Sequence, residues 1–82
     1  MPVVLRVKGY RFWFYEADLD EPPHIHVGKG DQGAKYWLTP IALAMSRKFR
    51  VHELHEIERI LVEYKGDILR AWRKEQQKRG NR

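Results

Sequence analysis

The sequence predicts an α+β fold: an antiparallel sheet of two hairpins, with four to five strands, followed by one long or kinked C-terminal helix packed on one sheet face. Two patterns lead to this expectation. Up to residue 45, short runs rich in β-branched and aromatic residues alternate with glycine, proline and acidic clusters, which is typical of hairpins. From Val51 onward, apolar residues recur every three or four positions, as the buried stripe of a helix requires. Because the chain has 82 residues, we expect one hydrophobic core.

The expected strands are bounded by residues that end or begin sheet structure. Gly9 stands where a tight turn would close the first hairpin, and Pro22 and Pro23 end an acidic loop because proline cannot donate to a sheet. A turn at residues 30–33 closes the second hairpin. We expect a short edge strand after Pro40, with a bend as the alternative. The expected strands are residues 3–8, 10–15, 24–29, 34–39 and 41–45.

The helical segment carries one uninterrupted apolar stripe, formed by Leu54, Ile57, Leu61, Tyr64, Ile68 and Trp72. Gly66 and Asp67 could divide it, since glycine is unfavourable inside a helix and aspartate is a good N-cap. The continuous stripe favours one long or gently kinked helix instead. Beyond Trp72 the pattern is lost, so we expect residues 1–72 to form a single domain and residues 73–82 a basic, flexible tail.

Most of the net positive charge lies at the C-terminus. The formal net charge is +5, and residues 73–82 supply +4 of it, with five Lys/Arg against one Asp/Glu. The rest of the chain is therefore nearly neutral, which weakens the inference of a nucleic-acid partner from total charge alone.

Two absences exclude classes of protein. The sequence has no cysteine, which excludes disulfides, thiolate catalysis and zinc sites with sulfur ligands. It also has no apolar run of membrane-spanning length. We expect a cytoplasmic protein without membrane contact.

Strand alternation sorts the expected sheet residues into two faces. One face is almost purely apolar and is expected to meet the helix. The other face mixes aromatic, cationic and imidazole groups, so we look for function there. The apolar set is Val3, Leu5, Val7, Tyr10, Phe12, Phe14, Ile25, Val27, Tyr36 and Leu38, and the polar set is Val4, Arg6, Lys8, Arg11, Trp13, Tyr15, His24, His26, Lys35 and Trp37.

His24 and His26 form the centre of the polar face, because residues two positions apart on a strand project to the same side. Their separation suits two ligands of one metal ion, but a cysteine-free zinc site needs a third nitrogen or carboxylate. Several residues could supply this third ligand, but none stands at a diagnostic spacing. They are Glu16, Asp18, Asp20, Glu21, His52 and His55. We therefore assign no metal ligand and expect no cofactor, and a metal-binding protein is our third hypothesis.

Two other hypotheses use the polar face without a metal ion. In the first, the two histidines act as acid and base and nearby cations hold a phosphate, as in metal-free cleavage of RNA. Trp13 and Trp37 could then stack bases. In the second, the histidines pair with the acidic loop and the aromatic residues form an interface with a partner or a second copy. His52 and His55 fit solvated helix positions.

Several segments, taken together, resemble a known family. They are Val4-Leu5-Arg6, Gly9-Tyr10-Arg11-Phe12, Pro22-Pro23-His24-Ile25-His26-Val27, Ala34-Lys35-Tyr36-Trp37-Leu38 and Leu69-Arg70-Ala71-Trp72. The pattern resembles a small prokaryotic domain-of-unknown-function family over nearly the whole chain except the tail, and Pro-Pro-His-x-His-Val is its most specific part.

The resemblance implies a short bacterial or archaeal protein, often encoded beside a second small uncharacterised domain in an arrangement suspected to be toxin–antitoxin. It implies no activity. The family usually has Ser or Thr before its main helix, where this chain has Arg50. Its recurrent positions correspond here to Arg6, His24, His26, Lys35, Trp37 and Trp72.

We therefore predict a component, in one form the toxin, of a two-protein toxin–antitoxin-like module whose sheet face is directed to nucleic acid or phosphate. If the protein is an enzyme, we expect a metal-free, ribonuclease-like activity. The alternative is a non-catalytic module that binds a partner or DNA, as an antitoxin would. Expected partners are a small protein from the same operon and RNA or DNA, with a homodimer left open. The predicted catalytic residues are His24, His26 and Lys35, and the predicted binding residues are Arg6, Arg11, Trp13 and Trp37.

Overall fold

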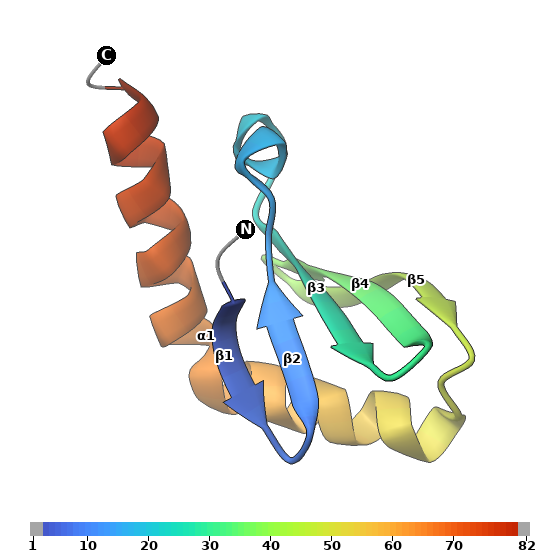
Figure 1. Ribbon diagram of the computed structural model, residues 1–82. Coiled ribbons are helices and arrows are strands. Elements are labelled where there is room, and N and C mark those ends of the chain that lie inside the picture. The colour runs from blue at the N-terminus through green and yellow to red at the C-terminus, as the bar shows by residue number, and fades with distance from the viewer. Residues whose placement is uncertain (1–2, 81–82) are drawn as a thin grey trace.

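The computed structural model describes residues 3–80, in which a five-stranded antiparallel sheet is followed by one helix (Figure 1). The strands lie side by side in chain order, and a short 3-10 helix, η1 (Glu16–Asp20), connects the second to the third. The helix α1 (Val51–Gly80) follows the last strand. The predicted α+β fold is therefore confirmed. The strands are β1 (Val3–Val7), β2 (Tyr10–Trp13), β3 (His24–Lys29), β4 (Gln32–Leu38) and β5 (Ile41–Arg47).

Local sequence explains most strand ends. Lys8 and Gly9 have φ angles of 51° and 85°, the left-handed pair that closes a two-residue hairpin between β1 and β2. The segment after Pro40 is a strand and not a bend. It runs to Arg47, past the predicted end at Met45, and forms one edge of the sheet.

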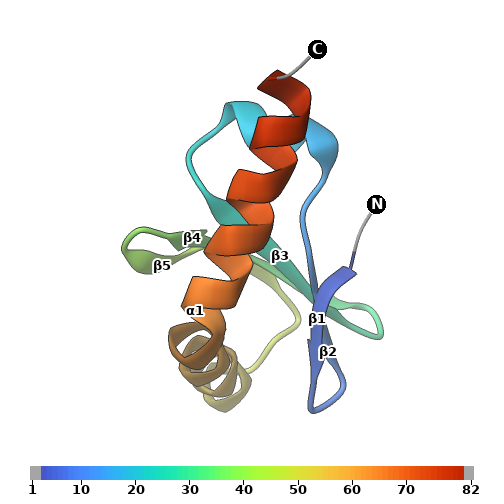
Figure 2. The same ribbon diagram turned by 90° about the vertical axis from the view of Figure 1, so that its left-hand side faces the viewer.

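The helix α1 is continuous through Gly66, as the apolar stripe predicts, and it bends in its orange part (Figure 1). Its first half runs beneath the strands and its second half rises beside η1, which is clear when the molecule is turned (Figure 2). Gln76 Nε2 donates to the backbone oxygen of Leu19 at 3.1 Å. Helix thus continues beyond the domain boundary predicted at Trp72, while flexibility of the tail stays a prediction. Within residues 3–80, no helix combines the length and apolar character needed to cross a membrane.

The start of α1 is stabilised by its own third residue. The Arg50 backbone N–H donates to Glu53 Oε1 at 2.9 Å, which is half of a capping box. This bond is the main reason that the pKa of Glu53 lies below its usual value. The glutamate therefore satisfies the backbone N–H of the residue that precedes the helix, a bond that does not require Ser or Thr at position 50.

The apolar face of the sheet packs against α1, as predicted. The alternation of buried and exposed positions fails at His24, which is buried, and near the N-terminus, where the pairing of β1 with β2 shifts between Val3 and Leu5. This irregularity leaves Val3 38% exposed and packs Val4 against the core, so these two assignments were wrong. The buried core includes Tyr10, Phe12, Phe14, Ile25, Val27, Tyr36, Leu38, Ile57, Leu61, Ile68 and Trp72.

Candidate functional site

One row of paired residues crosses all five strands on the face opposite the first half of α1. The register pairs Arg6 with Arg11, Arg11 with Gly28, Gly28 with Gly33, and Gly33 with Arg47. Directly paired residues in an antiparallel sheet lie on the same face. Arginines on the outer strands therefore flank two glycines on the central strands. The Trp13 ring lies over Gly28, whereas the nearest side-chain atom to a Cβ at Gly33 would be Arg47 Nη2 at 3.8 Å.

A groove of about 320 Å³ follows this row. Arg11 and Arg47 line it, together with Lys35, and no Asp or Glu is among its lining residues. Within the described part of the chain, neither Arg11 nor Arg47 forms an ion pair. The groove therefore presents two uncompensated guanidinium groups, which favour an anionic ligand. We call it the cationic groove.

The neighbouring row forms one wall of the cationic groove. It pairs Trp13 with His26 and His26 with Lys35. The Trp13 and His26 rings stack, with centroids 5.8 Å apart and planes at 22°. Lys35 Nζ lies 4.7 Å from the centre of the Trp37 ring and 3.6 Å from Glu21 Oε1. Both contacts hold the lysine at the groove's edge, and the glutamate offsets part of its charge.

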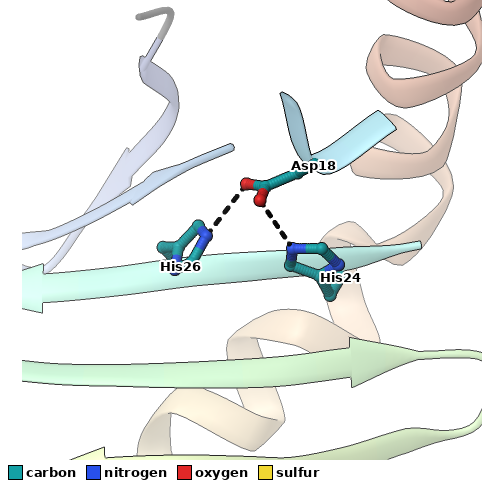
Figure 3. Close-up of side chains that lie close together, drawn as sticks. All are labelled: Asp18, His24 and His26. Atoms are coloured by element: carbon teal, nitrogen blue, oxygen red, sulfur yellow. Dashed lines mark hydrogen bonds and ion pairs between the residues drawn. The ribbon is translucent and has the colours of Figure 1, made fainter. Parts of the chain in front are cut away.

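Beside the wall, Asp18 of η1 lies between the two histidines (Figure 3). His26 Nε2 is 2.9 Å from Asp18 Oδ2, and His24 Nε2 is 3.3 Å from Asp18 Oδ1. The Tyr15 backbone N–H also donates to Asp18 Oδ2, at 2.8 Å. Asp18, His24 and His26 form a compact group, which we call the histidine pocket.

His24 is the most enclosed member of the histidine pocket. It is fully buried, whereas the side chains of His26 and Asp18 are 22% and 14% exposed. The bend of α1 accounts for this burial, because the second half of the helix brings Trp72 against His24, with centroids 5.3 Å apart. Trp37 covers it from the paired position on β4.

The tautomer of His24 follows from its contacts. Its Nδ1 lies 2.9 Å from the backbone oxygen of Pro22, which can only accept, so Nδ1 carries the proton and donates. The other nitrogen, Nε2, is buried, faces Asp18, and forms no hydrogen bond. His24 Nε2 thus faces a carboxylate oxygen without a hydrogen bond of its own.

The carboxyl group of Asp18 is held in its ionised form. Burial raises its pKa, but the Tyr15 N–H and the two histidines more than offset that effect. The net pKa lies below the usual aspartate value. Asp18 is therefore a carboxylate at neutral pH, and its oxygens act as acceptors.

Comparison with known proteins places the chain in a family. The model of a family described as domain of unknown function, DUF4160, matches residues 9–73, which include β2 to β5 and most of α1. The chain belongs to the DUF4160 family. No curated protein and no solved structure matches it. The predicted membership of a domain-of-unknown-function family is thus confirmed, and the match includes both the cationic groove and the histidine pocket.

The fold of this DUF4160 protein brings only some of the predicted site residues together. Arg11, Trp13, His26 and Lys35 all line the cationic groove. Three others lie elsewhere: Arg6 ends the row on β1 outside the groove lining, Trp37 packs against His24, and His24 is buried. The predicted catalytic and binding roles stay predictions.

Sequence analysis missed Arg47. We ended the last strand at Met45, two positions too early, so its alternation was not followed onto the polar face. Met45 pairs with Lys35, and Arg47 pairs with Gly33 on that same face. Continuing the alternation by one step would have found the second guanidinium of the groove. Asp18, in contrast, was among the candidate third ligands.

Proposed function

We propose that the cationic groove of this DUF4160 protein binds the phosphate backbone of single-stranded RNA. The observation that carries the proposal is the row in which Arg11 and Arg47 flank Gly28 and Gly33. Guanidinium groups match phosphate oxygens in a bidentate manner. Gly33 leaves space for a ligand close to the sheet, since Gly28 is covered by the Trp13 ring. The two arginines, three strand spacings or about 14 Å apart at the backbone, can contact different phosphates of one strand.

Aromatic side chains beside the groove support a single-stranded ligand. Trp13 lies in its wall, and Tyr15, 45% exposed, meets the Trp13 ring edge to face with centroids 6.5 Å apart. Trp13 is half-buried, so Tyr15 is the more accessible of the two rings. Open sheets that bind single-stranded RNA use aromatic rings to stack unpaired bases next to cations that hold the backbone. A duplex would keep its bases stacked inside and make no use of these rings.

The same geometry favours binding over cleavage. Metal-free cleavage by a histidine pair needs two imidazoles that reach the substrate. Only His26 lines the groove, because His24 is fully buried. The ribonuclease activity therefore stays a prediction, tested by incubating RNA with the protein and a chelator. Cutting that is lost in His26→Ala, with the fold retained, would establish it.

The predicted partner protein has a suitable surface on β5. Among the described residues no strand pairs with its outer edge, and Leu43 and Met45 are 42% and 61% exposed. Unpaired edges with apolar side chains favour the addition of a strand from another chain. We propose that the toxin–antitoxin-like partner, encoded next to this protein and present with it in the cytoplasm, docks there. Met45→Lys should abolish co-purification with the coding neighbour, whereas Val62→Lys on α1 should not.

Chemical-shift mapping tests RNA binding directly. A short oligoribonucleotide added to ¹⁵N-labelled protein should shift the amides of Gly28, Gly33 and Lys35 in a saturable manner. Amides on the outer face of the first half of α1, such as those of Arg59 and Val62, should stay in place. Shifts confined to α1, or none at all, would contradict the proposal. Inorganic phosphate in a parallel titration separates recognition of a strand from general anion binding.

A further inference from the structure

We infer that the histidine pocket binds one divalent transition-metal ion of the zinc class through His24 Nε2, His26 Nε2 and an oxygen of Asp18. From the sequence alone we assigned no metal ligand, because nothing placed the third group. The fold supplies it, since η1 brings Asp18 over the pair on β3 (Figure 3). One ligand atom from each residue lies within 4.8 Å of the others.

The buried Nε2 of His24 is the observation that points to a cation. Nε2 is enclosed and without a hydrogen bond, and it faces Asp18 Oδ1 at 3.3 Å. An Nε2 without a proton and a carboxylate oxygen are both acceptors, and two enclosed acceptors that face each other are unfavourable unless a positive charge lies between them. A separation of 3.3 Å also suits two ligands of one metal ion, each about 2.0–2.1 Å from it.

Hydrogen bonds and ring contacts around His24 and Asp18 orient them in the way that metal ligands are generally oriented. A histidine that binds a metal generally donates its other ring N–H to a carbonyl or carboxylate, which fixes the tautomer. His24 does so through Nδ1 to Pro22. Ligating carboxylates are themselves hydrogen-bonded, and Asp18 accepts from the Tyr15 backbone N–H. The ring orientation of His24 is fixed further by Trp37 and Trp72.

The donor set indicates which metal ion fits. Imidazole nitrogens suit Zn²⁺ and similar ions, whereas Mg²⁺ and Ca²⁺ prefer oxygen ligands. Three protein ligands leave one tetrahedral position for water. The competing occupant is a proton on His24 Nε2, which would form an ion pair with Asp18. A metal ion and a proton cannot occupy the same nitrogen, so the two are distinguishable.

Calorimetric titration of the full-length, chelator-treated protein with Zn²⁺ tests the inference. We expect saturable one-to-one binding and a higher melting temperature with Zn²⁺ but not Mg²⁺. Asp18→Asn and His26→Gln should each weaken binding at least tenfold. The matched control replaces His52 and His55, the exposed histidines of α1, by alanine and should leave affinity unchanged.

The outcomes separate this inference from RNA binding. No saturable Zn²⁺ binding by the wild type, or affinity that survives Asp18→Asn and His26→Gln, would overturn the metal site. Loss of binding in the His52 and His55 control would do the same. The ¹⁵N chemical shifts of the histidine rings give a second measurement that needs no variant. Zn²⁺ should change the chemical shift of His24 Nε2. A shift that shows a protonated Nε2 with Zn²⁺ present would overturn the inference. Because RNA is absent throughout, failure here leaves the cationic groove proposal standing.

Discussion

The ring of Trp13 lies directly over Gly28, so closely that a Cβ atom at residue 28 would sit 2.9 Å from Trp13 Cη2. Real Cβ atoms essentially never make so short a contact. Glycine at this position therefore allows the Trp13 ring, in the wall of the cationic groove, to lie over residue 28 while stacking on His26. The groove depends on this absence of a side chain as much as on its arginines.

Gly28→Ala should displace Trp13. The ring must move from the new methyl group and lose part of its stacking on His26, so the indole N–H resonance of Trp13 should shift and RNA affinity should fall. For the Trp13 resonance, Gly33→Ala is the matched control, because its nearest atoms would be 3.8 and 3.9 Å from the new Cβ, an ordinary contact. If both variants give the Trp13 resonance of the wild type, the packing described here is wrong.

Leu61→Ala should destabilise the fold by about 2–5 kcal/mol, because it removes a fully buried side chain where α1 meets the sheet. Its neighbour Val62 is 68% exposed, so Val62→Ala should change the free energy of unfolding by no more than about 0.5 kcal/mol. Urea denaturation of both variants measures the difference. Equal effects would place the buried stripe of α1 on another face.

Alkaline pH should destabilise the protein through its buried tyrosines. Burial, then the bond to Glu56, raises the pKa of Tyr10 to about 12, and burial beside Glu58 raises the pKa of Tyr36 as well. In the unfolded chain the tyrosine hydroxyls ionise near pH 10. The contribution of these tyrosines to the stability of the folded protein is therefore complete below about pH 10 and falls as the pH rises towards about 12. Urea denaturation at several pH values across this range measures whether the free energy of unfolding falls as the pH rises. Tyr10→Phe should lose less stability over the same interval, and an equal loss would contradict the assignment to Tyr10.

Local pattern was enough to predict the sheet and the helix. The Lys8–Gly9 turn, the prolines before β3 and the apolar stripe of α1 are each fixed by neighbouring residues, and the structure contains the corresponding elements. Strand ends were less accurate, since β2 ends at Trp13 and β5 continues to Arg47. Pairing with the next strand, which alternation alone does not reveal, extends or shortens each strand.

The candidate site could be predicted only in part because it depends on long-range packing. Alternation correctly put Arg11, Trp13, His26 and Lys35 on one face, but it could not show that His24 on the same strand is buried. That burial comes from Trp72, brought back by the bend of α1. The position of Asp18 likewise depends on how η1 folds over the end of β3, which no spacing along the chain encodes.

The salt dependence of oligoribonucleotide binding tests the central claim most directly. Each phosphate contact that is removed should reduce the slope of log affinity against log salt concentration by about 0.7 for a single strand. Arg11→Ala and Arg47→Ala should each weaken binding and flatten the slope by about this amount, and the double variant by about twice as much. Arg59→Ala, the same change on the exposed face of α1 away from the groove, should match the wild type. Unchanged affinity and slope in the Arg11 and Arg47 variants would contradict the account.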